Sequence, residues 1–448
     1  MMRSHRTGRG TVGLALCAAT IAALVPGGTG GTADAATVAS TTLISVAVDG
    51  KPGAGASGEP SVSADGRYVA FRSSARNLVG GDTNGVDDVF VRDRVAGVTT
   101  RVSVDRNGAE GNGASWAPSI SADGRYVAFV SDSRNLVPGD TNVFRDVFVH
   151  DRLIGWTSRV SGGLLGAPGN DDSLHPAISA DGRFIAYDSF AGNLVAGDTN
   201  RVRDVFEYDQ QSDRTVRVSV DSSGMEVRGA SQLPSIAADG RYVTFESDAT
   251  TLTSSDTNQA TDVFVHDKLT GLTDRVSVNA HGDQGQGASN FSTMSVDGRY
   301  VAYQSAAENL LPNPGDTNGK VDNFLVDRQT STVTRLNVLY TGGQDSDGTT
   351  QGVRPSIAAD GRYTAFDSFA WRLVPFDRNS VGDVFVRDRD TATTTRASVA
   401  GNGAEGNGNS ATPSISADGK HVAFQSVATN FATGTDMWTP NVYLRDLG

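Results

Sequence analysis

The chain has 448 residues, with 38 Lys and Arg against 51 Asp and Glu, so its formal net charge is −13. This acidic balance, without a cluster of basic residues, argues against nucleic acid or an anionic membrane as the main partner. A single cysteine excludes a disulfide framework and a cysteine-rich zinc site. The 52 glycines, about 12% of the chain against the usual ~7%, indicate many tight turns.

Residues 1–35 have the features of an export signal. Three arginines within the first nine residues precede an apolar run from Thr11 to Val25, and Ala33-Asp34-Ala35 offers a cleavage site. We therefore expect cleavage near Ala35 and a secreted, extracellular protein. No later stretch approaches 18 consecutive apolar residues, so we expect no integral membrane segment.

The rest of the chain is built from seven copies of one unit. The phrase S-A-D-G-R-Y-V-A-F and its variants are followed by N-L-V-x-G-D-T-N-x-x-x-D-V-F-V-x-D-R, then by G-x-T-x-R-V-S-V and a glycine-rich tail. Five of the six spacings between copies are 58 residues and one is 63. A period of this length indicates a repeat architecture. The aspartate of the first phrase stands at 65, 123, 181, 239, 297, 360 and 418.

Each unit predicts four strands, taken here from the second copy. Residues 118–121 form a short first strand, and Asp123-Gly124 is the residue pair of a tight hairpin. Residues 125–131, 146–150 and 157–161 are the second, third and fourth strands, rich in β-branched and aromatic residues. Four antiparallel strands per unit are typical of a β-propeller blade.

The two ends of the chain predict a closed ring. The last copy, residues 413–446, stops after its third strand, and the missing fourth strand is found at residues 41–46. Pairing the two ends would complete the seventh blade and remove exposed sheet edges. We therefore predict an all-β fold, a seven-bladed propeller with four strands per blade, in which residues 36–448 are a single domain.

These repeats resemble the WD-like propeller repeat of the TolB family, which is found also in the propellers of prolyl-oligopeptidase-like enzymes. The resemblance rests on S-A-D-G-R-Y-V-A-F followed by D-V-F-V-x-D and covers the whole chain after the export signal. It implies the fold, but this repeat serves many partners. TolB has six blades and an added α/β domain, whereas this chain has seven units and no G-x-S-x-G hydrolase motif.

The loops between the second and third strands suggest an ion site. In a four-stranded blade these loops and the glycine-rich tails emerge at the same end of the ring, which is where elaborated segments carry function. Oxygen ligands in the pattern D-x-N-x-x-x-D suit calcium, whereas turn and cap chemistry explains the same residues without an ion. Both interpretations stay open, and no other cofactor is indicated. The candidate ligands are Asp82, Asn84, Asp88, Asp140, Asn142, Asp146, Asp198, Asn200, Asp204, Asp256, Asn258, Asp262, Asp316, Asn318, Asp322, Asp377, Asn379 and Asp383.

Large aromatic residues interrupt the small polar residues of these loops and, at Trp116, of the glycine-rich tail that connects one blade to the next. Exposed aromatics suit stacking on a sugar or on a peptide side chain, although such residues can equally fold back to cover the blade. The histidines show no metal-binding spacing, and His150 and His266, at equivalent third-strand positions, are expected to be exposed. The candidate ligand-binding residues are Trp116, Phe144, Trp371, Phe376 and Trp438.

The function that this sequence favours is a secreted, non-enzymatic binding or scaffold protein that takes a protein or carbohydrate ligand on its acidic, loop-rich face. We expect a monomer, with calcium as a candidate stabiliser of the loops. The alternative is a secreted propeller enzyme, a carbohydrate lyase or glycoside hydrolase, with a site at the mouth of the central channel. An enzyme needs an asymmetric cluster of His, Arg and carboxylates there, and the near-repetition of the units predicts none, so no catalytic residue is named.

Overall fold

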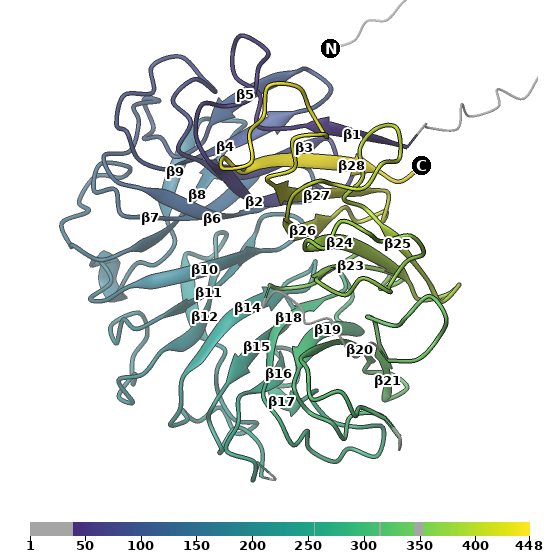
Figure 1. Ribbon diagram of the computed structural model, residues 1–448. Coiled ribbons are helices and arrows are strands. Elements are labelled where there is room, and N and C mark those ends of the chain that lie inside the picture. Colours follow the sequence, from purple (N-terminus) through teal and green to yellow (C-terminus); the bar gives the residue numbers. More distant parts are fainter. Residues whose placement is uncertain (1–38, 255, 313–314, 345–352) are drawn as a thin grey trace, which may run out of the picture. The chain divides into compact units, whose positions relative to one another are not determined.

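A computed structural model describes residues 39–254, 256–312, 315–344 and 353–448, and the predicted export signal lies outside these residues. The described residues form seven separate four-stranded antiparallel sheets, which are the blades of a propeller (Figure 1). This confirms the predicted fold class. Within the same residues no helix is long and apolar enough to cross a membrane, and the one helical segment is the 3-10 turn η1 (Leu164–Gly166).

Blades 1 to 3 consist of β2 (Ser57–Val62), β3 (Tyr68–Ser73), β4 (Asp88–Asp93) and β5 (Val98–Arg101); β6 (Ser115–Ile120), β7 (Tyr126–Ser131), β8 (Asp146–Asp151) and β9 (Trp156–Arg159); and β10 (Ser173–Ile178), β11 (Phe184–Ser189), β12 (Asp204–Asp209) and β13 (Arg214–Arg217). Blades 4 and 5 consist of β14 (Ser231–Ile236), β15 (Tyr242–Ser247), β16 (Asp262–Asp267) and β17 (Leu272–Arg275); and β18 (Ser289–Met294), β19 (Tyr300–Ser305), β20 (Asp322–Asp327) and β21 (Thr332–Arg335). Blades 6 and 7 consist of β22 (Ser356–Ile357), β23 (Tyr363–Ser368), β24 (Asp383–Asp388) and β25 (Thr393–Arg396); and β26 (Ser410–Ile415), β27 (His421–Ser426), β28 (Asn441–Asp446) and β1 (Ser40–Leu43).

The first and last strands of the described residues pair in blade 7, as predicted. Strand β1 pairs antiparallel with β28, with Leu43 opposite Tyr443. The strand is shorter than the predicted 41–46, because the chain turns at Ser45, whose hydroxyl donates to Asn441 Oδ1 at 3.0 Å. This closure removes the free edge that the third strand of blade 7 would otherwise expose.

The first strand of a blade starts earlier than predicted. In blade 2 the strand begins at Ser115, and its register with β7 shifts between Trp116 and Ser119. The shift accommodates Ala117, which has a φ of 49° just before Pro118. Such a bulge leaves the strand intact but turns the side chains near it. Trp116 therefore lies within the first strand and not in the connecting tail.

The core lies between neighbouring blades. One cluster joins Val91 and Val102 of blade 1 to Phe129 and Phe148 of blade 2, all of them buried. Within blade 2 the two phenylalanine rings stack with their centroids 6.0 Å apart. The repeated Y-V-A-F and D-V-F-V phrases thus provide both faces of each interface, and burial of this apolar surface holds adjacent blades together.

The D-G-R-Y phrase also joins neighbouring blades, at the end of the ring that carries the short hairpins. Gly124 has a φ of 72°, and a Cβ on it would lie 2.2 Å from the ring of Tyr68 in blade 1. Arg152 of blade 2 lies 4.6 Å from the same ring. Arg125 pairs through two nitrogens with Asp151, whose carboxylate also accepts from the amide of Leu153. The aspartate that ends the third strand is thus both a turn residue and an arginine partner.

The expectation that His150 and His266 are exposed is wrong. They are 5% and 7% exposed, and each Nδ1 lies 2.9 Å from the hydroxyl of a threonine on the adjacent outer strand. Burial lowers the pKa of His150 to about 4, so this ring is neutral at pH 7.

Candidate functional site

The predicted calcium loops surround an arginine. In blade 1, Nη1 of Arg101 lies 2.8 Å from Glu110, 3.3 Å from Asp88 and 3.6 Å from Asp82. The amide of Asn84 donates to Asp88 and to a backbone carbonyl of the tail. The fourth-strand arginine, which the loop motif did not include, therefore supplies the positive charge that a cation would bring.

The same arrangement recurs in five more blades, so the structure brings all the predicted aspartates and asparagines into equivalent clusters. Each loop asparagine donates to the second aspartate of its own loop. Blade 7 has neither aspartate, and its arginine position is Leu43. The arginines of blades 2 to 6 and their loop aspartates are Arg159 with Asp140 and Asp146, Arg217 with Asp198 and Asp204, Arg275 with Asp256 and Asp262, Arg335 with Asp316 and Asp322, and Arg396 with Asp377 and Asp383.

In blade 1 the carboxylate oxygens of Asp82, Asp88 and Glu110 lie within 4.8 Å of one another, close enough for one ion to contact all three. Blade 3 has a second such cluster, made by Asp198, Asp204 and Glu226. The guanidinium already lies among these oxygens, and calcium needs six to eight oxygen ligands. Burial raises the pKa of Asp198 to about 6, and the charge of Asp204 adds to this effect. The donor set is therefore that of an internal ion pair, and calcium would have to displace the arginine.

A central channel of about 400 Å³ is lined by the first strands of all seven blades. Near its loop-rich end, one position of the repeat carries a different residue in every blade, and we call these residues the channel ring. Six of the seven have a φ between 49° and 57°, which points each side chain away from the regular strand direction. The channel ring consists of Glu59, Ala117, His175, Leu233, Phe291, Arg354 and Thr412.

His175 of the channel ring is held in place by a buried carboxylate. Its Nδ1 lies 2.9 Å from Oδ2 of Asp188, a carboxylate that is fully buried in the neighbouring strand β11. The same oxygen accepts from the backbone amide of Leu233 at 2.9 Å. Arg203 is 3.7 Å from the other oxygen, an ion pair too long for a hydrogen bond. Asp188 therefore orients the imidazole and directs Nε2 away from itself.

Two further carboxylates repeat this bridging role. Glu246 accepts from the amide of Phe291 at 2.8 Å and from Gln232 at 2.7 Å. Glu59 accepts from the amide of Ala117 at 2.8 Å and pairs with Arg72 at 3.1 Å. In each case an acidic side chain satisfies the backbone of the next blade at its strained residue, so these acids hold the ring together.

Arg354 reaches across the channel from blade 6 to blade 4. Its guanidinium donates to the carbonyls of Leu233 and Pro234 at 2.7 and 2.9 Å. Burial lowers the pKa of Arg354, while the charges of Glu246 and Asp188 oppose that effect. A cation is thus fixed inside the channel by neutral carbonyl groups.

The expectation of near-repetition at the channel mouth is wrong. His, Arg and carboxylate side chains from blades 1, 3, 4 and 6 make an asymmetric set there, with Gln304 of blade 5 donating to the carbonyl of Val353. The repeat sequence already contained an indication of this asymmetric set. When the seven copies are aligned, the residue directly before the phrase P-S-x-S-A-D-G differs in all of them. The position directly before it also differs in all seven copies, so the variable stretch covers two adjacent residues at the first strand.

The predicted aromatic residues are at the loop-rich end but are not all alike. Trp438 and Phe376 are 89% and 80% exposed, and Trp371 and Phe144 are exposed to a smaller degree. Phe376 has a φ of 61°, a strained value for a large side chain. Trp116 is half-buried, with Arg145 5.6 Å from its ring. Blades 6 and 7 therefore present the most accessible aromatic surface of the five predicted residues.

The described chain resembles other solved propellers at low sequence identity. An oligogalacturonate lyase in complex with manganese matches with a TM-score of 0.55 and 13% identity over 92% of this chain and 96% of the other. The β-propeller domain of the Trilobed protease from Pyrococcus furiosus matches with a TM-score of 0.52 and 10% identity, over 87% and 95%. TolB from Acinetobacter baumannii matches with a TM-score of 0.40 and 14% identity, over 78% and 65%.

These likenesses show the fold alone. No protein-family model and no curated protein matches the chain. The TolB resemblance drawn from the repeat motif is not specific, because a lyase and a protease domain share the propeller architecture. Function must therefore be argued from the residues themselves.

Proposed function

We propose that this chain is an exported, non-enzymatic binding or scaffold protein that holds a carbohydrate or protein ligand at the loop-rich end of the propeller. The channel ring carries this proposal, since a seven-fold repeat that varies its residue at one position creates a surface with seven different side chains. The exposed aromatics of blades 6 and 7 add stacking surface at the same end. Export rests on the sequence of residues 1–35.

A screen of the purified protein against immobilised glycans and peptides tests the proposal. The His175→Asn variant should lose binding at least tenfold, because it removes the ring nitrogen that faces away from Asp188. His281→Asn is the matched control, since His281 is exposed on the tail of blade 4. Equal binding by the wild type and His175→Asn would place the ligand elsewhere and contradict the proposal.

A propeller enzyme is the second candidate, and the pair of His175 and Asp188 favours it. With Nδ1 donating to the buried carboxylate, Nε2 can accept a proton from a substrate. Mass spectrometry of the recovered ligand separates the two functions. An unchanged ligand supports a binding protein, and a cleaved ligand supports the enzyme.

A further inference from the structure

Blade 2 departs from the other blades in its glycine-rich tail. In the other six blades a valine begins the tail and bridges to the residue six positions later, whereas in blade 2 this pair is Gly162 and Pro168. A Cβ on Gly162 would meet no atom within 4 Å. The missing valine therefore leaves open space on the side of blade 3. The six valines are Val46, Val104, Val220, Val278, Val338 and Val399.

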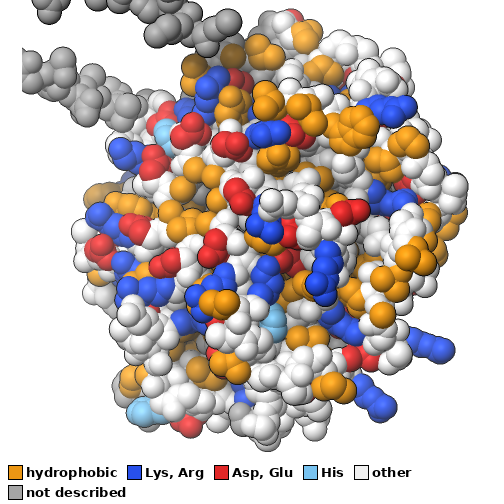
Figure 2. Space-filling model, turned by 180° about the vertical axis from the view of Figure 1, so that it is seen from behind, with side chains coloured by type: hydrophobic (Ala, Val, Ile, Leu, Met, Phe, Trp, Pro, Cys, Tyr) orange, Lys and Arg blue, Asp and Glu red, His pale blue; other side chains and the backbone are white. Residues whose placement is uncertain are grey.

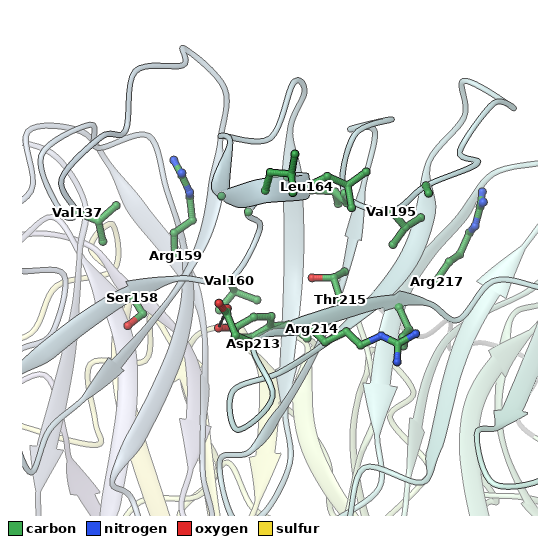
Figure 3. A pocket seen from close by; sticks show the side chains of 18 of the residues that line it. Val137, Ser158, Arg159, Val160, Leu164, Val195, Asp213, Arg214, Thr215 and Arg217 are labelled. Atoms are coloured by element: carbon green, nitrogen blue, oxygen red, sulfur yellow. Dashed lines mark hydrogen bonds between the residues drawn. The ribbon is translucent and has the colours of Figure 1, made fainter.

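A groove of about 1100 Å³ occupies this place between β9 of blade 2 and β13 of blade 3. Its lining includes Trp156, Leu164, Val195 and Tyr208, which gives it an apolar character. Figure 3 shows Leu164 lying across the top of the groove. Leu165, next to it, is fully exposed with a φ of 61°. A strained, exposed leucine beside an apolar groove is unfavourable in isolation and indicates a binding surface.

The second residue of this bridge also differs in blade 2 from its equivalents in other blades. In blades 1, 3, 4, 5 and 6 the fourth strand carries the clustered arginine, and the residue bridged to the tail valine is a glutamate or a glutamine. Blade 7, which has Leu43 in place of the arginine, has Pro52 there. Blade 2 alone combines the arginine, Arg159, with a proline, Pro168. Its arginine therefore lacks the partner that the tail supplies elsewhere. The tail residues of the other blades with an arginine are Glu110, Glu226, Gln284, Gln344 and Glu405.

Blade 3 shows what that partner does. The carboxylate of Glu226 accepts from the amide of Thr199 at 2.8 Å, from its hydroxyl at 2.6 Å and from the guanidinium of Arg217. Blade 1 repeats all three contacts: Thr83 donates to Glu110 through its amide, at 3.0 Å, and through its hydroxyl, and the guanidinium of its arginine donates at 2.8 Å. Two blades thus hold a carboxylate in the same three-donor site.

In blade 2 the equivalent donors are the amide and hydroxyl of Thr141 and the guanidinium of Arg159. No residue in the described ranges accepts a hydrogen bond from Thr141. Arg159 lies 3.3 Å from Asp140 and 4.0 Å from Asp146, and it also lines the groove. The carboxylate site of blades 1 and 3 is therefore present without its carboxylate, and it adjoins the space left by the missing valine.

We propose that blade 2 binds a small carboxylic acid with an apolar body. The ligand carboxylate takes the place of the missing glutamate and accepts from Thr141 and Arg159. The apolar body takes the place of the missing valine and lies against Trp156 and Leu164. The groove volume slightly exceeds the usual range of small-molecule sites, so it can accommodate such a ligand. This site lies on the outer side of blades 2 and 3 and is independent of the channel ring.

Isothermal titration of the full chain with decanoate tests this assignment. Decanoate should bind at least tenfold more tightly than decanol, which has the same body without the charge. Pro168→Glu and Gly162→Val should each weaken decanoate binding at least tenfold, because each returns to blade 2 the residue that other blades use to fill the site. Both are expected to fold, since they restore the pattern of the repeat. Thr141→Val, in an exposed loop, provides a third variant and should weaken binding several-fold.

Pro52→Glu is the matched control, because blade 7 has no arginine beside that proline, and it should leave decanoate binding unchanged. His175→Asn should also leave it unchanged, so that failure of the channel proposal and of this one can be told apart. Decanol binding as tightly as decanoate would overturn the proposal. So would full binding by a folded Pro168→Glu variant.

Discussion

Arg396 and Glu405 form an ion pair at 2.7 Å, and the same guanidinium lies 3.3 and 3.6 Å from Asp377 and Asp383. Arg396→Leu would leave buried carboxylates without their cation, and we expect it to lower the free energy of unfolding by about 3–5 kcal/mol. Unfolding in urea measures this. The combined variant Arg396→Leu, Asp377→Thr and Asp383→Asn copies blade 7 and should recover most of the loss. A combined variant no more stable than the single one would contradict the ion-pair account.

Calcium should leave the stability of the protein unchanged. Six loop sites with an affinity near 10⁻⁴ to 10⁻³ M, typical of extracellular calcium sites, would together add roughly 8–16 kcal/mol at ~10 mM calcium. The arginine among the carboxylates supplies that charge already, as Arg101 does in blade 1. Thermal melts with calcium and after chelation measure the difference. A rise of several degrees on adding calcium would show that the loops bind the ion after all.

Gly124 and Gly108 offer a matched pair of substitutions to alanine. Both have positive φ, 72° and 80°, so each alanine is strained by about 1–2 kcal/mol. At Gly124 the new Cβ would also meet the ring of Tyr68 at 2.2 Å, whereas at Gly108 nothing lies within 4 Å. We therefore expect Gly124→Ala to lose about 1–3 kcal/mol more than Gly108→Ala. Equal losses of unfolding free energy in denaturant titrations would mean that the Tyr68 contact between blades does not contribute to stability.

Buried His150 should make the protein less stable in mild acid. Because its pKa is about 4 in the folded chain and 6.5 when exposed, the unfolded state takes up a proton first as the pH falls below 6.5. The wild type should then lose about 1.4 kcal/mol per pH unit relative to His150→Gln, down to about pH 4. Urea midpoints of both proteins at pH 7, 6 and 5 measure this, since other titrating groups cancel. Parallel curves would contradict the assignment.

The repeat was sufficient to predict the blades. A phrase that recurs every 58 residues, with alternating apolar positions and an Asp-Gly pair, can bury its apolar faces only by stacking on copies of itself. The placement of the N-terminal strand against β28 followed from counting strands at both ends. The errors were local, and the predicted strand limits differ from the observed ones by up to three residues. The bulge at Ala117 lengthens the first strand of blade 2, and the turn at Ser45 shortens the fourth strand of blade 7.

The calcium motif shows why the charge clusters could not be predicted. The loop aspartates and the fourth-strand arginine are separated by 13 residues or more, as Asp88 and Arg101 are, and no spacing rule links them. Only the pairing of the third and fourth strands brings the guanidinium to the carboxylates. Blade 7 lacks the arginine, which is replaced by Leu43, and both aspartates, which are replaced by Thr435 and Asn441. This joint loss is visible in the sequence, but without the strand pairing it does not indicate that these residues interact.

The sequence by itself determined the number of blades, the strands in each and the closure of the ring, because these depend on local periodicity and on repetition. The tertiary structure decided what lies across the channel and between the blades. Arg354 meets Leu233 although 121 residues separate them, and Arg159 borders the groove between blades 2 and 3. Such contacts depend on which side chains the closed ring brings together, and a ring of seven similar units reveals its sites only where the units differ.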